Sequence, residues 1–135
     1  MDSAINRLVV RLPICWQEKA MIVFWHGRAV SENDRLLPGK GRFRANPDYK
    51  AFKESVAWAC KLENEHLEGP VSVRLFLELG LRMDAQNVIK PVLDALELAG
   101  VIKNDKQVRS FSFHREDRAA KEEDRIGILV QEMKE

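Results

Sequence analysis

Cysteine is scarce in this 135-residue sequence, which contains only Cys15 and Cys60. They form no Cys-x-x-Cys pair, so the sequence predicts neither a disulfide framework nor a zinc site with thiolate ligands. The histidines, His26, His66 and His114, share no metal-ligand spacing such as i and i+4 on one helix. Neither residue type therefore enters the candidate site.

Long hydrophobic runs and an excess of one charge are also lacking. The longest apolar run, 20–25, is far shorter than the ~20 residues that span a bilayer, and no signal-peptide pattern begins the chain. We therefore expect a soluble, cytoplasmic protein with no membrane partner. The 22 Lys and Arg nearly balance the 21 Asp and Glu, so a nucleic-acid partner has to be argued from where the charges lie.

The length and the 45% apolar content predict one compact domain with a real core. We place this domain at residues 21–135. Residues 1–20 form an N-terminal extension, or an edge strand if the β-prone segment 8–12 pairs with the sheet. The fold class is α+β, a single domain with a mixed β-sheet and two main helices packed on it.

Alternating and helical periodicities define the expected elements. Asn46 is the predicted cap of a first helix that ends near Glu65, and Gly100 stops a second helix that starts at Asn87 or Val88. Pro91 fits this second helix only in or next to its first turn. The predicted strands are 21–25, 71–83, 108–113 and 126–132, and a long basic loop covers 27–44.

Four polar residues near the second helix suggest phosphoryl chemistry. Asp84 follows the predicted strand 71–83, Asn87 and Lys90 begin the helix, and Asp105 lies in the next turn. If the helix packs back along the sheet, the four can converge, and two close carboxylates favour a hard divalent cation. A lysine suits charge that accumulates on a phosphate. The alternative is structural, because Asp after a strand or in a turn is usually a cap or turn former.

A family resemblance favours the first interpretation. The run RMDAQNVIKPVLDAL at 82–96, followed by GVIKNDKQV at 100–108, resembles the signature of RusA-type Holliday junction resolvases. The segment GRAVSEN at 27–33 is similar to that family's loop after the first strand, and the resemblance covers most of 21–133. It implies a homodimeric, metal-dependent endodeoxyribonuclease that resolves four-way DNA junctions with paired nicks.

Individual roles also follow from the resemblance. Asp84 and Asp105 match metal-binding carboxylates, Lys90 matches the catalytic lysine, and Asn87 and Asp94 match supporting positions. The implied cofactor is Mg²⁺, or Mn²⁺ in its place.

Gln86 is the departure from the family pattern, because it stands where the second Asp of the Asp-x-Asp motif is expected. A Gln carbonyl can still ligate a metal, but one negative charge is lost. The alternative is therefore a branched-DNA-binding homologue that cleaves weakly or not at all. A third reading is a protein-interaction module without DNA affinity.

The loop 27–44 is the expected DNA-binding segment, because basic side chains in a glycine-containing loop suit phosphate contacts. A charged loop that is merely solvated is the alternative. Phe43 and Trp25 suit either stacking on unpaired bases or packing. The predicted DNA-binding residues are Arg28, Asn33, Arg35, Lys40, Arg42 and Arg44.

Overall fold

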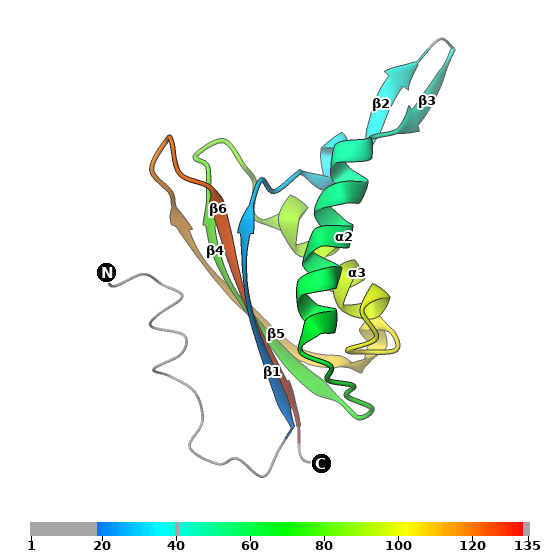
Figure 1. Cartoon of the computed structure of the whole chain (residues 1–135), viewed down its shortest axis with the longest axis vertical. Helices are drawn as coiled ribbons and strands as arrows, with labels where there is room; N and C mark the ends of the chain where they lie inside the picture. The colour runs from blue at the N-terminus through cyan, green and yellow to red at the C-terminus, as the bar shows by residue number, and fades with distance from the viewer. Residues whose placement is uncertain (1–18, 40, 134–135) are drawn as a thin grey trace.

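The computed structural model describes residues 19–39 and 41–133. Its helices and strands follow one another in a single α+β chain (Figure 1). The elements are β1 (Ala20–Gly27), the 3-10 helix η1 (Glu32–Asp34), β2 (Leu36–Gly39), β3 (Arg42–Ala45), α2 (Pro47–Leu62), β4 (Val71–Leu79), α3 (Gln86–Leu98), the 3-10 helix η2 (Asp105–Gln107), β5 (Val108–Asp117) and β6 (Asp124–Glu132).

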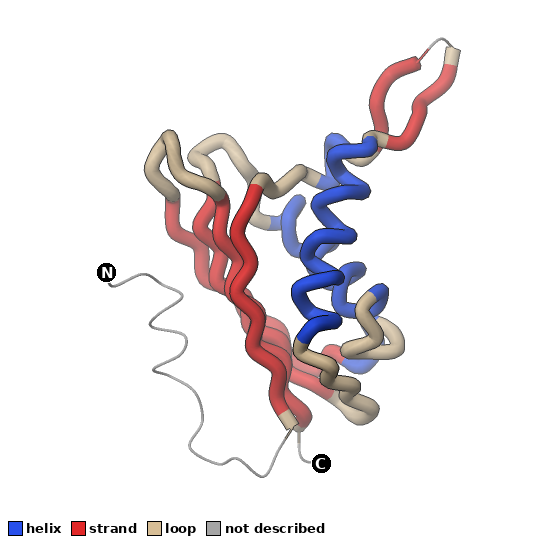
Figure 2. Tube along the Cα trace, viewed as in Figure 1, coloured by secondary structure: helices blue, strands red, loops and turns tan. Residues whose placement is uncertain are grey.

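The main sheet has four strands in the order β1-β6-β4-β5. Strand β5 is parallel to β4, whereas β6 runs antiparallel to both of its neighbours, β1 and β4. Both α-helices lie on one face of this sheet (Figure 2). The predicted mixed sheet with two packed helices is therefore confirmed.

The core fills the space between the helices and that face of the sheet. Every second residue of β4 from Val71 to Leu79 is buried, which is the alternation of a strand with one covered face. The apolar faces of α2 and α3 pack against this buried face of β4. They include Phe52 and Val56 of α2 and Val88 and Val92 of α3.

The ends of several elements differ from the prediction, β4, α3 and β5 among them. Strand β4 stops at Leu79 although the alternation of residue types continues to Met83, and Leu81 is exposed in the turn that follows. Helix α3 begins one residue early at Gln86, so Pro91 is its sixth residue and lies past the first turn. Because proline has no N–H, it cannot donate to the carbonyl four residues before it. Strand β5 extends beyond the predicted 108–113.

The predicted basic loop contains a small antiparallel hairpin. Strands β2 and β3 form a second, two-stranded sheet that projects from the N-terminal end of α2, away from the main sheet (Figure 1). We call this hairpin, Leu36–Ala45, the arm. The sequence pattern did not predict these strands, because the glycines on both sides of the turn are typical of loops. One of them, Gly41, adopts a positive φ of 72°.

Helix α2 begins as predicted. The Asn46 side chain accepts a hydrogen bond from the Asp48 N–H at 3.0 Å, and Pro47 occupies the first turn. Among the described residues, no helix is both long and apolar enough to cross a membrane. The possible edge strand at 8–12 lies outside the described residues, so the domain boundary at 21 stays a prediction.

Candidate active site

A cavity of about 650 Å³ opens beside the end of β4, where the loop after β1, the base of the arm and the starts of α2 and α3 meet. Four of the predicted site residues line it: Arg28, Asn33, Asp84 and Asn87. The acids Asp34, Asp48 and Asp124 and the bases Arg82 and Arg118 also line it, and the prediction included none of these.

Asp84 is held at the cavity by a short turn after β4. The Met83 N–H donates to the Gly80 carbonyl at 2.9 Å, and Arg115 of β5 donates to the carbonyls of Gly80 and Met83. The Asp84 carboxylate accepts a hydrogen bond from the Gln86 N–H at 3.1 Å, at the first turn of α3. The N-cap of α3 is Ala85, so Asp84 forms a local turn just before the helix and also lines the cavity. The structural and the functional interpretation of Asp84 are therefore compatible.

Asp124, the first residue of β6, fixes the other wall of the cavity. Its side chain is buried, with the residue 3% exposed, and Oδ2 accepts a hydrogen bond from the Ala29 N–H at 2.9 Å. Oδ1 accepts from the Gly80 N–H at 3.2 Å and from Arg118 Nε at 2.5 Å. One carboxylate thus connects the loop that carries Arg28 to the turn that carries Asp84.

No local pattern in the sequence indicates this role of Asp124. The charged stretch 115–125 mixes both signs without periodicity, which is a pattern typical of a solvated loop. In the structure Arg115, Arg118 and Asp124 from that stretch hold the backbone around the site. The backbone partners of Asp124 lie 44 and 95 residues away in the sequence, a separation that no spacing rule covers.

Replacing Asp124 with Ala should lower the free energy of unfolding by about 3 kcal/mol, because two backbone N–H groups and the Arg118 guanidinium lose their acceptor. Urea denaturation monitored by tryptophan fluorescence would measure the loss. Asp117→Ala is the matched control, since its carboxylate is 55% exposed and 3.3 Å from Arg115. That variant should lose less than ~1 kcal/mol. Equal losses for the two variants would contradict the clamp role of Asp124.

Lys90 lies on α3 next to Asn87, since residues three apart share a helix face. Its Nζ is 3.1 Å from Asp94 Oδ1, and Lys53 Nζ lies 3.8 Å from the other Asp94 oxygen. The hydrogen bond and the charge of Asp94 raise the pKa of Lys90, and the charges of Asp105 and Glu32 add to the rise. The supporting role predicted for Asp94 is consistent with this contact and stays a prediction.

Asp94→Asn should shift the alkaline limit of cleavage to lower pH. If Lys90 has the catalytic role that the family resemblance implies, cleavage is lost as pH rises through the Lys90 pKa, and removing Asp94 lowers that pKa. At neutral pH the rate should stay within about fivefold of the parent, since an exposed ion pair contributes up to ~1 kcal/mol. A pH–rate profile of junction cleavage measures both effects. Glu54→Gln, which breaks the exposed Lys50 pair on α2, should leave the profile unchanged.

Asp105 lies at the other end of α3 from Asp84. It begins η2, and Val108 three residues later pairs with Val71 at the start of β4. Asp84 precedes the start of α3 and Asp105 follows its end, so a helix of 13 residues, about 18 Å long, lies between the two backbone positions. Helix α3 does pack back along the sheet, and this packing carries the chain away from Asp84.

Within 19–39 and 41–133, no three His, Cys, Asp or Glu side chains are grouped so that they could hold a metal ion. Gln86 is exposed as the first residue of α3 and is not among the residues that line the cavity.

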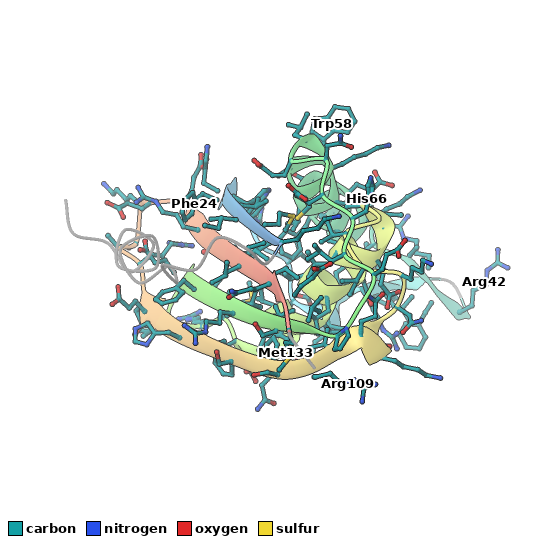
Figure 3. All side chains as sticks on the ribbon, turned by 90° about the horizontal axis from the view of Figure 1, so that it is seen from below. Phe24, Arg42, Trp58, His66, Arg109 and Met133 are labelled. Atoms are coloured by element: carbon teal, nitrogen blue, oxygen red, sulfur yellow. The ribbon has the colours of Figure 1, made fainter. Side chains whose placement is uncertain are left out.

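Two of the six predicted DNA-binding residues line the cavity, and three others lie on the arm or at its base. Arg28 and Asn33 line it, whereas Arg42 and Arg44 lie on the exposed arm, where Figure 3 shows Arg42 extending into solvent. Arg35 lines a neighbouring hollow at the base of the arm. Lys40 lies outside the described residues.

Comparison with known proteins identifies the family of this chain. No curated protein matches the chain. The family model described as endodeoxyribonuclease RusA matches residues 28–131, from the loop after β1 to the last strand, and so includes every predicted site residue. The chain therefore belongs to the RusA family of endodeoxyribonucleases, the enzymes that cut Holliday junctions.

Proposed function

We propose that this chain cleaves four-way DNA junctions by Mg²⁺-dependent phosphodiester hydrolysis at the cavity around Asp84, with paired nicks as the product. The observation that supports this site is the meeting of Asp84, Asn87 and Arg28 around one open cavity at the base of a basic arm. A carboxylate for a cation and a guanidinium for a phosphate are the two charges that such hydrolysis needs.

The donor set around the cavity fits a hard cation. Nucleases of this family are metal-dependent. Asp84 offers a carboxylate, and Asn33 and Asn87 offer amide oxygens. Mg²⁺ is usually bound by one or two carboxylates, and water and substrate phosphates complete its coordination shell. Mn²⁺ has the same preference for oxygen. When bound, the cation lowers the pKa of a water and neutralises phosphate charge.

Lys90 and Asp94 serve the reaction from the adjacent turns of α3. Asn87, Lys90 and Asp94 lie on one helix face, so their polar stripe runs from the cavity toward the end where Asp105 lies. Lys90 is held as a cation by Asp94, and its ammonium group stabilises negative charge on the phosphate as the bond breaks. Arg28 orients the scissile strand at the opposite wall.

Asp105 joins the site in a homodimer. Because α3 separates Asp105 from Asp84 within one chain, the two carboxylates meet only if Asp105 comes from the second copy. A symmetric dimer would then contain two equivalent composite sites, each with Asp84 from one chain and Asp105 from the other. A four-way junction has the matching two-fold symmetry. Each site would cut one of two opposed strands, which gives paired nicks.

A synthetic four-way junction tests the function directly. The protein, with Mg²⁺ or Mn²⁺, should cut two opposed strands at symmetric positions, should leave the linear duplex of the same sequence intact, and should be inactive in EDTA. Binding to the junction should weaken as salt rises, in proportion to the number of phosphate contacts. Cleavage of linear duplex at an equal rate would contradict the junction specificity.

Gln86 supports a second candidate function, junction binding without efficient cleavage. It replaces the second carboxylate of the motif, and its side chain lies outside the lining of the cavity. This candidate predicts tight, salt-dependent junction binding and no cut in either metal. The protein-interaction reading predicts no DNA binding even at low salt.

A further inference from the structure

We propose that a second hollow, beside the Asp84 cavity, accepts one unpaired nucleobase from the branch point of the junction. This inference rests on the proposed function and adds a base-binding subsite to it. The hollow has a volume of about 390 Å³ and lies where the arm joins η1. It is lined by Glu32, Asn33, Arg35, Leu36 and Phe43.

The arm has two chemically different faces. In its register Pro38 pairs with Phe43 and Gly39 pairs with Arg42, and directly opposed residues share a face. One face is therefore apolar and the other is basic, since side chains alternate along each strand. The apolar face carries Leu36, Pro38, Phe43 and Ala45, and the basic face carries Leu37, Arg42 and Arg44.

The two faces of the arm line different hollows. Leu37, from the basic face, lines the Asp84 cavity, whereas Leu36 and Phe43, from the apolar face, line the second hollow. The backbone of bound DNA would thus follow the basic face past the catalytic carboxylate. A base that leaves the stack would meet the apolar face of the same arm.

Exposure of the apolar face has no structural explanation in the single chain. Phe43 is 71% exposed and Leu36 is 45% exposed, on a hairpin that packs little against the core. Burial of such side chains is favourable, so their exposure on one face of the arm suits a binding surface. A flat aromatic ring between arginines suits a nucleobase, because stacking is combined with phosphate contacts nearby.

Polar groups in the hollow match the edge of a base. Glu32 accepts hydrogen bonds, Arg35 donates them, and the Asn33 amide does both. Within the described part of the chain, no hydrogen bond joins the side chain of Asn33 or Arg35 to another residue. These groups are therefore available to a ligand with both donors and acceptors, which is the pattern of base edges.

Asn33 connects the subsite to the chemistry. It lines both the second hollow and the Asp84 cavity, so a base held against Phe43 belongs to a nucleotide next to the phosphate at Asp84. A junction offers such a base at low cost, because unpairing at a branch point is easier than within a duplex. The subsite would thereby place the cut at a fixed distance from the branch.

Junctions with 2-aminopurine at single branch-point positions test this inference, since its fluorescence rises when the base leaves the stack. Binding of the parent should raise the signal severalfold at one position on each cut strand. Phe43→Ala should abolish the rise and weaken junction binding roughly tenfold, in line with the ~1–3 kcal/mol of a stacked base. Phe43→Trp should retain both.

Phe24→Ala is the matched control. It removes the same ring from β1, where Phe24 is 47% exposed and lies on the opposite side of the molecule from Arg42 (Figure 3). This variant should behave as the parent. A parent that binds the junction without any rise in signal, or a Phe43→Ala protein with the parent's signal and affinity, would overturn the subsite and leave the nuclease proposal standing. Failure of the parent to bind branched DNA at all would reject both.

Discussion

A mixture of two inactive variants should recover junction cleavage. Chains with Asp84→Asn and chains with Asp105→Asn should each be inactive alone, because each variant loses one carboxylate from every site. In a mixed dimer with composite sites, one site receives both substitutions and the other receives none. Random pairing leaves about a quarter of all sites intact, each in a dimer with one working site. A gel assay should show single nicks in place of paired nicks.

The reciprocal mixture gives the control. A chain that carries both substitutions is mixed with the parent, so composite sites in the mixed dimer each lose one carboxylate and none works. The parent homodimers, about a quarter of all dimers, give paired nicks in either arrangement, so the readout is single nicks from the mixed dimers. If instead each chain built its own site, this second mixture would add single nicks and the first mixture would cut nothing. The two arrangements therefore predict opposite results with the same four proteins, and the measurement does not depend on the absolute rate.

Much of the fold followed from the sequence, because the relevant signals are local. Strand β4 shows alternation over nine residues, Asn46 and Pro47 give the start of α2, and Gly100, with a φ of 77°, stops α3. The end of β4 was misplaced because Leu81 and Met83 continue the pattern of residue types. Periodicity depends only on residue type, so it cannot predict the turn after Leu79. That turn is held by hydrogen bonds from Arg115, which is distant in the sequence.

The site could be predicted only in part, for the same reason. Asp84 and Asn87 are close in sequence, and the motif placed them correctly beside one another at the start of α3. Their distance from Asp105 depends on the direction of α3 and on the parallel pairing of β5 with β4, which are long-range features. Asp124 is a similar case, since its partners are distant in the sequence and its own segment has no periodic pattern.

Gln86→Asp should lower the Mg²⁺ concentration needed for cleavage about 30-fold. A carboxylate and a divalent ion ~4 Å apart attract by roughly 2 kcal/mol even at the dielectric constant of water, and this energy corresponds to that factor. The Gln86 N–H lies 3.1 Å from the Asp84 carboxylate, so a short acid at this position begins close to the proposed cation. An acid in the first turn of α3 also favours the helix, so folding should not suffer.

Gln86→Asn separates charge from size, because asparagine matches the shape of aspartate and stays neutral. Mg²⁺ titrations of the cleavage rate should give the Asn variant the parent's midpoint and the Asp variant a much lower one. If the Asp variant cuts and the parent does not at any Mg²⁺ concentration, the native protein acts by binding junctions. If Asp and Asn give the same midpoint, position 86 lies outside the metal site, and the cation depends on Asp84 and the carboxylate from the second chain.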